Sequence, residues 1–451
     1  SIDSNELKHN NTPFKHHAGN IDNIIVDIFR KDSQRTRKAK KLLNLLKQFK
    51  FTVEEKTSDM YSIIKNHHSR ENRNKLEKLL MVCDRLDSAD DKGIVRQKQH
   101  SQNTVISTPF GYTKEKIELD FLKKYFKILA EKMIEVFQNY EKDKNIRTLR
   151  KEILNNVKDV FVHALGETRV PANDVSLWDH SYSTATIFKT ELSRLALGEG
   201  YRLDNLNRRI FGICWNGDKF INTGKKVADI LVRKNIIEKI KRNIRKEFEV
   251  NYPLGNVIYE DINGIYITFP ELDDYCKTKK IVRECAEKAL YIIKVISKCE
   301  IWPFFTLSAP KRNLTVITDE LKYAESMKKI PKMSPVIFID NGSIERDKIW
   351  LDYMYQKGKA DESNKVIWDI CPVCKIRKKN EGDERCKYCK RRNETRINKW
   401  LGNRRTTIWI DEIADVNNRY ALLNLNFNLE KWLDGTMIST IFSQTYEDWF
   451  Y

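Results

Sequence analysis

Long apolar runs are missing from this sequence of 451 residues: no stretch of about 18 consecutive apolar residues occurs in it. A membrane-spanning helix needs a run of that length, so we expect no membrane span. No secretory signal peptide is visible either. The chain opens at Ser1 without a methionine, which leaves its natural start open.

Paired cysteines of the kind that make disulfide frameworks are also lacking, because the nine cysteines are odd in number and four of them cluster. Cys371-Pro-Val-Cys374 is followed, after eleven residues, by Cys386-Lys-Tyr-Cys389. Two CxxC pairs at this spacing bring four thiolates to one tetrahedral Zn²⁺. Four thiolates leave no position for water, so the predicted zinc site is structural. This usage indicates a reducing cytoplasm, and we expect the other five cysteines to be buried thiols.

Acidic residues are outnumbered, with 63 Asp and Glu against 82 Lys and Arg, for a net charge of +19. One interpretation is a lysine-rich soluble protein, and the other is a partner of polyanions. Crowding of cations in Lys31–Lys41, Arg233–Lys246 and Lys375–Arg405 favours the second. Seven cations around the cysteines are either a phosphate-binding surface or a solvated face: Arg377, Lys378, Lys379, Lys387, Lys390, Arg391 and Arg392.

The stretch Gly255–Pro270 predicts a β-hairpin. Its arms are Val257–Glu260 and Ile265–Phe269, both rich in β-branched and aromatic residues. The turn Asp261–Gly264 contains Asn-Gly, which is typical of tight hairpins because it supplies a positive φ. Asp261 is the carboxylate of this turn.

Elements on either side of the hairpin complete a fold. The pattern predicts a strand at Ile210–Trp215, a helix at about Gly224–Glu249, a second helix at about Lys280–Lys298 and a strand at Ile301–Leu307. The order β-α-β-β-α-β is ferredoxin-like. Such a fold is a palm, on which polymerases and nucleotide cyclases place two metal-binding carboxylates.

The N-terminal region is predicted to be mainly helical, and one part of it carries imidazoles and carboxylates. His67 and His68 precede a helix that leads to Asp84. Histidine and aspartate together hold the metal that activates water in phosphohydrolases. The alternative, which the spacing alone favours, is a histidine pair at a helix end and a solvated acidic turn. The expected helices are Ile21–Phe29, Leu42–Phe49, Met60–Ile64, Leu76–Cys83 and Phe121–Phe137.

A further helix is expected to begin at Trp178–Ser181, with Asp179 or Ser181 as its cap. The neighbours Asp179, His180 and Ser181 cannot form a catalytic triad within one helix. We therefore interpret this segment as a structural helix start, with His180 as a candidate addition to the earlier cluster.

The C-terminal segment predicts β-β-α. Thr406–Ile410 and Tyr420–Phe427 are expected to pair through Asp415–Asn418, and Leu429–Phe442 is expected to be an amphipathic helix. These elements bury too little to stand alone. Either they dock on the palm or the sequence ends inside a second domain, and we favour the latter. Residues 311–365 are interpreted as a connecting region with helix and turn signals and no clear chemistry.

Together, and in this order, these landmarks resemble the large signature subunit of type III CRISPR–Cas interference complexes. That family has an HD domain, a first palm, a zinc ribbon, a second palm and a helical bundle. The sequence motif GETRVPANDVSLWDHS resembles that of the III-D-like branch. The matching segments are His67-His68 with CDRLDSADDK, GETRVPANDVSLWDHSYSTA, ICWNGDKFI, NVIYEDINGIYITFP, CPVC with CKYC, and RYALLNLNFNLEKWLDG.

The resemblance implies an α+β multidomain protein. Residues 1–199 would form an all-helical HD-like domain, 200–310 the ferredoxin-like first palm, 311–405 a linker with the four-cysteine zinc ribbon, and 406–451 the start of an incomplete second palm. At about 150 residues per domain, this length predicts about three domains.

The sequence also departs from the family. The family's nuclease centre uses a His-Asp pair early in the HD domain, and none precedes His67. Its cyclase uses a GGDD turn, which is not reached before Tyr451, and an aspartate on the first strand of the second palm, where Asn426 and Asn428 stand here. A neutral amide is a poor Mg²⁺ ligand. In the first palm, Asp261 alone cannot make a two-metal site.

The leading hypothesis is therefore a scaffold and sensor for antiviral defence in the prokaryotic cytoplasm. It would bind the 5′ end of the CRISPR RNA and the flank of the target RNA beside the small and backbone subunits of the complex. Whether it is an enzyme stays open. One alternative is an active cyclic-oligoadenylate synthase or HD nuclease, using Mg²⁺ and ATP, whose catalytic residues lie outside this segment. Another is a free-standing polymerase or cyclase.

Overall fold

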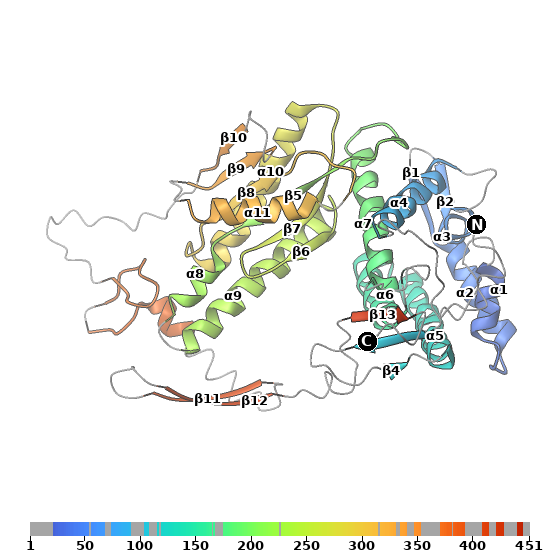
Figure 1. Ribbon diagram of the computed structural model, residues 1–451, viewed down its shortest axis with the longest axis horizontal. Helices are drawn as coiled ribbons and strands as arrows, with labels where there is room; N and C mark the ends of the chain where they lie inside the picture. The colour runs from blue at the N-terminus through green and yellow to red at the C-terminus, as the bar shows by residue number, and fades with distance from the viewer. Residues whose placement is uncertain are drawn as a thin grey trace. The chain divides into compact units, whose positions relative to one another are not determined.

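The computed structural model describes residues 21–53, 56–67, 74–91, 103–107, 115–116, 119–164, 166, 175–224, 227–313, 316–330, 334–340, 347–352, 370–380, 382–392, 408–414, 421–427 and 440–444 (Figure 1). They fall into two compact units. The division lies at Phe188 within helix α7 (Leu177–Ala196).

The first unit is mainly helical, as the sequence predicts. Its core is built by four helices whose apolar residues recur every three or four positions. Phe29 at the end of α1 is fully buried, and Phe137 of α5 packs edge-on against Phe49 with ring centroids 5.9 Å apart. The helices of this unit before α7 are α1 (Ile21–Ile28), α2 (Arg35–Gln48), α3 (Met60–Asn66), α4 (Lys75–Asp91), α5 (Leu119–Asp143) and α6 (Ile146–Phe161).

Short strands accompany these helices, and the helical periodicity did not predict them. β1 (Lys50–Val53) pairs with β2 (Lys56–Asp59), and β3 (Asn103–Ser107) pairs with both β4 (Glu115–Lys116) and β13 (Thr440–Gln444). The expected helix Leu429–Phe442 is therefore wrong at its C-terminal end. Thr440, Ile441 and Phe442 are β-branched or aromatic, and pairing with β3 uses that preference.

Helix α7 begins before the proposed caps. Ser176 is its N-cap: the backbone N–H of Asp179 donates to Ser176 Oγ at 3.2 Å, and the Asp179 carboxylate accepts from the Ser176 backbone N–H at 3.0 Å. This reciprocal pair is a capping box. The expectation that Asp179 or Ser181 is the cap is corrected, because Asp179 occupies the third position of the first turn.

The second unit is built on a six-stranded sheet in the order β10-β9-β8-β5-β7-β6 (Figure 1). Four of its strands are those expected, in the order β8-β5-β7-β6, all antiparallel. This is the order of a ferredoxin-like sheet, so the predicted palm topology is confirmed. The strands are β5 (Arg208–Cys214), β6 (Val257–Glu260), β7 (Gly264–Pro270), β8 (Phe304–Leu307), β9 (Val336–Ile339) and β10 (Asp347–Trp350).

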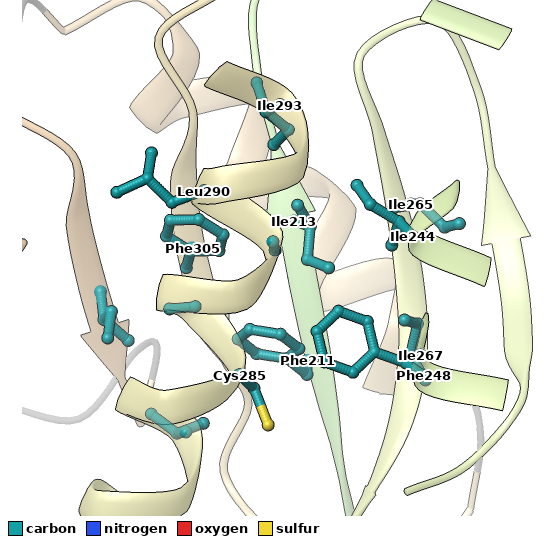
Figure 2. Close-up of a cluster of buried hydrophobic side chains, with 14 of the residues drawn as sticks. Phe211, Ile213, Ile244, Phe248, Ile265, Ile267, Cys285, Leu290, Ile293 and Phe305 are labelled. Carbon is teal, nitrogen blue, oxygen red and sulfur yellow. The ribbon is translucent and has the colours of Figure 1, made fainter. Parts of the chain in front are cut away.

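Two long helices pack on one face of this sheet. They are α9 (Val227–Lys246), which runs into a π-helical turn at Glu247–Asn251, and α10 (Tyr275–Ser297). Figure 2 shows Phe211 of β5 between Phe305 of β8 and Phe248. The rings of Phe211 and Phe305 stack with their centroids 6.0 Å apart, and the rings of Phe211 and Phe248 meet edge-on with their centroids 6.2 Å apart. Such aromatic contacts add to the free energy of burying the rings.

The connecting region 311–365 contains a helix, in line with its helix signals, and two strands that the sequence did not predict. Helix α11 (Val316–Lys328) covers the opposite face of the sheet, where Val316 and Ala324 pack with Ile210 and Tyr266. β9 adds to β8 in parallel, and β10 pairs antiparallel with β9. The sheet is therefore covered on both faces and is two strands wider than the minimal palm.

The hairpin turn differs from its prediction in one respect. Neither Asn263 nor Gly264 has a positive φ. Instead, the Asp261 carboxylate accepts from the Asn263 backbone N–H at 2.7 Å, and the Asp261 N–H donates to the Gly264 carbonyl at 3.1 Å. Gly264 is required by close approach, since a Cβ there would lie 3.0 Å from the Ile213 carbonyl oxygen.

The C-terminal hairpin is formed as predicted, with slightly different bounds. β11 (Ile408–Ala414) pairs antiparallel with β12 (Ala421–Phe427), so that Ile408 is opposite Phe427 and Ala414 is opposite Ala421. The predicted α+β class is confirmed. Within the part of the chain that the structure describes, every helix is too short or too polar to cross a membrane.

The joint between α8 (Gly217–Asn222) and the hairpin gives a test of the fold. A Cβ on Gly217 would lie 1.7 Å from the Ile262 carbonyl oxygen, whereas a Cβ on Gly200 has no neighbour within 4 Å. We expect Gly217→Ala to lower the free energy of unfolding by about 1–3 kcal/mol or more, since backbone must move. Gly200→Ala is the matched control and should change little. Equal midpoints of urea unfolding for the two variants would contradict this packing.

Candidate metal centre and palm tip

The four cysteines of the CxxC pairs come together in the second unit. Cys371, Cys374, Cys386 and Cys389 are all buried, and their Sγ atoms lie within 4.8 Å of one another. Among the described residues, no other group of three or more Cys, His, Asp or Glu side chains is arranged to hold a metal ion. The sequence prediction of one four-thiol centre is confirmed as geometry.

The spacing of the sulfur atoms fits zinc. A tetrahedral Zn²⁺ with Zn–S bonds of about 2.3 Å holds its sulfurs roughly 3.8 Å apart. The Sγ atoms of Cys374 and Cys386 are 3.8 Å apart. Two similar turns present the thiols: the Lys375 N–H donates to the Cys371 carbonyl at 2.8 Å, and the Lys390 N–H donates to the Cys386 carbonyl at 3.0 Å.

Hydrogen bonds around the cluster favour thiolate at one position. A hydrogen bond from the Cys389 thiol, together with backbone N–H groups of Ile376 and Arg377, lowers the pKa of Cys374 to about 4. The same hydrogen bond raises the pKa of Cys389, the proton donor of the pair. In addition, the Cys386 backbone N–H donates to Cys371 Sγ at 3.2 Å. Donors aimed at sulfur stabilise the thiolates that a metal requires.

Arginines fix this ribbon (residues 370–392) to the palm. The Glu300 carboxylate, whose side chain is 2% exposed, accepts from Arg377 at 2.6 Å and from Arg392 at 3.1 Å. From the palm side, Arg233 of α9 donates to the Val373 carbonyl at 2.5 Å. Guanidinium groups suit such buried, multiple hydrogen bonds. The ribbon is thus held on α9 and on the segment after α10.

Lysines of the ribbon point elsewhere. Lys375, Lys387 and Lys390 are exposed, and none of the three makes an ion pair with another described residue. The acidic residues between positions 370 and 392 are Glu381, Asp383 and Glu384, against nine lysines and arginines. Arg377 and Arg392 therefore dock the ribbon, while Lys375, Lys387 and Lys390 contribute positive charge to its exposed surface.

The palm tip is the hairpin turn and the start of α8. Asn263 Oδ1 accepts from the backbone N–H of Gly217 at 3.0 Å and of Asp218 at 3.2 Å. Trp215, fully buried, donates its backbone N–H to the Asn263 carbonyl and its indole N–H to the Ile262 carbonyl, both at 2.8 Å. These bonds clamp the turn to the end of β5.

Each carboxylate at the tip already has a partner inside the palm. Glu260 pairs with Arg245 at 2.9 Å, and Asp218 pairs with Lys328 at 3.2 Å. Asp261, the candidate catalytic carboxylate, accepts from its own turn. A two-metal site needs carboxylates that converge on open space, and these three are directed to separate partners.

At the end of β5, in the cavity that Asp261 also lines, the structure places neutral groups. Cys214 Sγ lies 3.5 Å from Tyr266 Oη. Burial raises the pKa of Cys214 to about 12, and burial likewise raises the pKa of Tyr266. Both therefore stay protonated at neutral pH and offer no charge to a magnesium ion.

In the first unit, the candidate Asp84 meets the histidine of α7 that the sequence suggested. His180 Nδ1 is 2.6 Å from Asp87 Oδ2, and His180 Nε2 is 3.2 Å from Asp84 Oδ1. Asp87 was not among the predicted residues, although it lies three positions after Asp84 on the same face of α4. Since a carboxylate occupies each ring nitrogen, this cluster ties α7 to α4.

Two of the remaining candidate residues are described. His67 is buried, and its Nδ1 lies 2.7 Å from the Ile64 carbonyl oxygen. Asn426 lies on β12 opposite Trp409. His68 and Asn428 lie outside the described residues.

Comparison with known proteins finds structural likeness without a match in sequence. No protein-family model matches the chain, and no curated protein matches it. Among solved structures, Csm1 in T. onnurineus is similar, with 14% identity and a TM-score of 0.45 over 69% of this chain and 48% of that one. A Csm1–Csm4 cassette in complex with AMPPNP is 13% identical, with a TM-score of 0.44 over 69% of this chain and 48% of that one. A cassette in complex with pppApA is 12% identical, with a TM-score of 0.40 over 56% of this chain and 37% of that one.

The chain thus spans about half or less of the Csm1 chains that it matches. At these identities and TM-scores the likeness decides neither fold nor function. The residues of this chain therefore have to support any functional proposal.

Thiol labelling tests the four-cysteine centre. Of the five cysteines outside the CxxC pairs, Cys83, Cys214 and Cys285 are buried as expected, whereas Cys276 is exposed and Cys299 is partly exposed, so the expectation is wrong for these two. At pH 8, DTNB should therefore react rapidly with Cys276 and slowly or not at all with Cys214 and Cys285. A strong zinc chelator should expose four further thiols. Cys371→Ser or Cys389→Ser should release about one zinc per chain, whereas Cys276→Ser should release none. Full retention of metal by the ligand variants would contradict a zinc ribbon.

The Asp84–His180–Asp87 cluster predicts a graded loss of stability. The Asp87 side chain is 6% exposed and that of Asp84 is 17% exposed. We expect Asp87→Asn to lower the free energy of unfolding by about 1–3 kcal/mol, because a charge-assisted hydrogen bond is weakened inside the protein. Asp84→Asn should cost less, and Glu135→Gln on the exposed surface of α5 should cost nothing measurable. Thermal unfolding followed by circular dichroism ranks the three, and the reverse order of the two aspartates would contradict the geometry.

Proposed function

We propose that this chain is a large-subunit component of a type III CRISPR RNA-guided complex, of the III-D-like branch, acting as scaffold and sensor. It would contact the 5′ end of the CRISPR RNA and the flank of the target RNA, beside the small and backbone subunits. The catalytic centres of its kind are degenerate in the residues of this chain. The observation that carries the proposal is a palm whose tip carboxylates are all engaged internally, joined to a docked four-cysteine ribbon.

The palm tip supports a non-catalytic role. The cavity beside Asp261 and Tyr266 has a volume of about 160 Å³, below the roughly 300–1,000 Å³ of typical ligand pockets. Helix α11 lines it with Leu321 and Lys328. A nucleotide with two magnesium ions therefore has neither the space nor the carboxylates that it needs at this point.

The ribbon supports contact with RNA. Lys375, Lys387 and Lys390 are exposed, while Arg377 and Arg392 are used for docking. Phosphate binding depends chiefly on such accessible cations, and it needs no sequence-specific contacts when base pairing supplies the specificity. We assign the metal to zinc, on the sulfur spacing described above, and its role is to hold the two CxxC turns together. It leaves no ligand position for chemistry.

The alternative is an active enzyme: a cyclic-oligoadenylate synthase using Mg²⁺ and ATP, or an HD nuclease whose catalytic residues lie outside this segment. The similar Csm1–Csm4 cassettes are complexes with pppApA and AMPPNP. His67, His68 and Asp84 stay candidates for the nuclease, and Asn426 and Asn428 for the cyclase. A free-standing polymerase or cyclase is a third class, which predicts ATP turnover by the purified chain without RNA.

A synthesis assay separates these functions. The chain, purified as its complex with guide RNA, should make little cyclic oligoadenylate from ATP and Mg²⁺ when target RNA is added. The reason is that asparagine amides grip Mg²⁺ poorly. Robust product that disappears in Asn426→Ala or Asn428→Ala, but persists in the control Asn243→Ala on α9, would establish the cyclase instead. Failure of the chain to purify with guide RNA would reject the scaffold role.

A further inference from the structure

A cleft of about 310 Å³ lies where the ribbon meets the palm. Its walls come from α8, from α9, from the segment before β8 and from the first CxxC turn, all within the second unit. The scaffold role proposed above does not itself require this cleft. Its charged and aromatic lining includes Lys219, Phe220, Arg233, Trp302 and Lys375.

The floor of this cleft is rigid and its polar groups are satisfied. Arg233 is 4% exposed and donates to the carbonyls of Phe220 and Val373, each at 2.5 Å, and to Thr223 Oγ1. Its guanidinium carbon lies 5.1 Å from the centre of the Phe220 ring. Glu300, at the same floor, is bound by the ribbon arginines. The floor is therefore held in place without a ligand: Arg233 is bound by carbonyl and hydroxyl oxygens, and Glu300 is paired with arginines.

The rim has the opposite character. Trp302 is 40% exposed, which is high for so large an aromatic side chain beside a cleft. Lys219 of α8 and Lys375 of the first CxxC turn are exposed, and neither makes an ion pair with another described residue. A partly exposed indole and two exposed ammonium groups that line one cleft match a nucleotide of a single strand. Its base stacks on the ring and its flanking phosphates meet the lysines.

We propose that the palm–ribbon cleft binds one nucleotide of single-stranded RNA, with the base on Trp302 and the adjacent phosphates at Lys219 and Lys375. The inference rests on the proposed function for the choice of RNA as the polyanion. It goes beyond that function by naming the place and the mode of contact. Among the described residues that line the cleft, Glu300 is the only carboxylate and is already bound by arginines, so the contact needs no metal ion.

The two kinds of contact give different experimental signatures. For single strands, the slope of log K against log salt falls by about 0.7 for each phosphate contact removed. Lys219→Gln with Lys375→Gln should therefore reduce the slope by about 1.4 and weaken binding at low salt. Trp302→Ala should weaken binding about tenfold or more, within the range of one lost base stack, and leave the slope unchanged.

Binding is measured by fluorescence anisotropy. The full chain, in its complex, is titrated against a labelled single-stranded RNA that is longer than the 5′ segment of the guide RNA. Trp350→Ala on β10, 53% exposed, controls for loss of an exposed tryptophan. Lys280→Gln with Lys322→Gln, both exposed and outside the cleft, controls for loss of two charges. Equal zinc content in all variants shows that the Lys375 change leaves the ribbon folded.

Two results overturn the proposal while leaving the proposed function intact: RNA bound equally well by Trp302→Ala and Trp350→Ala, or a salt slope that is unchanged by the Lys219 and Lys375 pair. Crosslinking of a 4-thiouridine RNA gives an independent readout, and the expected peptide contains Trp302. Crosslinks confined to other peptides also reject the cleft. If no variant and no wild-type chain binds RNA at any salt concentration, the proposed function itself fails.

Discussion

One buried carboxylate, Glu300, holds the palm and the ribbon together. It lies just after α10 and binds two arginines that come from opposite ends of the ribbon, Arg377 near the first CxxC turn and Arg392 after the second. Removing one partner of such a buried set is strongly destabilising, because the others are left as uncompensated charge. The four-cysteine centre fixes the ribbon internally, and Glu300 fixes where it sits. The palm–ribbon cleft exists only because both constraints act at once.

Internal pairing of charge also explains the palm tip. Carboxylates are present there, but they are bound by Arg245, Lys328 and a backbone N–H. Cys214 and Tyr266 stand protonated at the point where negative oxygen would be needed. A palm of this composition keeps the sheet and the hairpin while it lacks the field that attracts magnesium. In the scaffold role proposed above, the palm is the platform that carries the ribbon.

Much of this was predictable from the sequence, and the failures have physical reasons. Local periodicity and spacing predicted the hairpin arms, the two palm helices and the four clustered thiols, and the structure contains all of them. The bounds of α11 and the strands β9 and β10 were missed, since α11 packs on a face of the sheet that was not anticipated and the short apolar run of β9 pairs with a strand distant in sequence. Asp87 was missed because its partner His180 lies 93 residues away, and no local pattern reports such a pairing. The prediction of a positive φ in the Asn-Gly turn failed because a tertiary contact overrode a local preference. Hydrogen bonds from Trp215 fix the backbone of this turn.

Covering both faces of the sheet has a consequence for assembly. With α9 and α10 on one side and α11 on the other, helices already occupy both faces of the described sheet. Its main-chain hydrogen-bonding groups can pair with a neighbour along the outermost strands, β6 and β10, as at the edges of any sheet. A further β-element that extends this layer must therefore add laterally, lengthening the row of strands. Growth by strand addition is thereby restricted to one dimension, with one position for a new strand beside β6 and one beside β10.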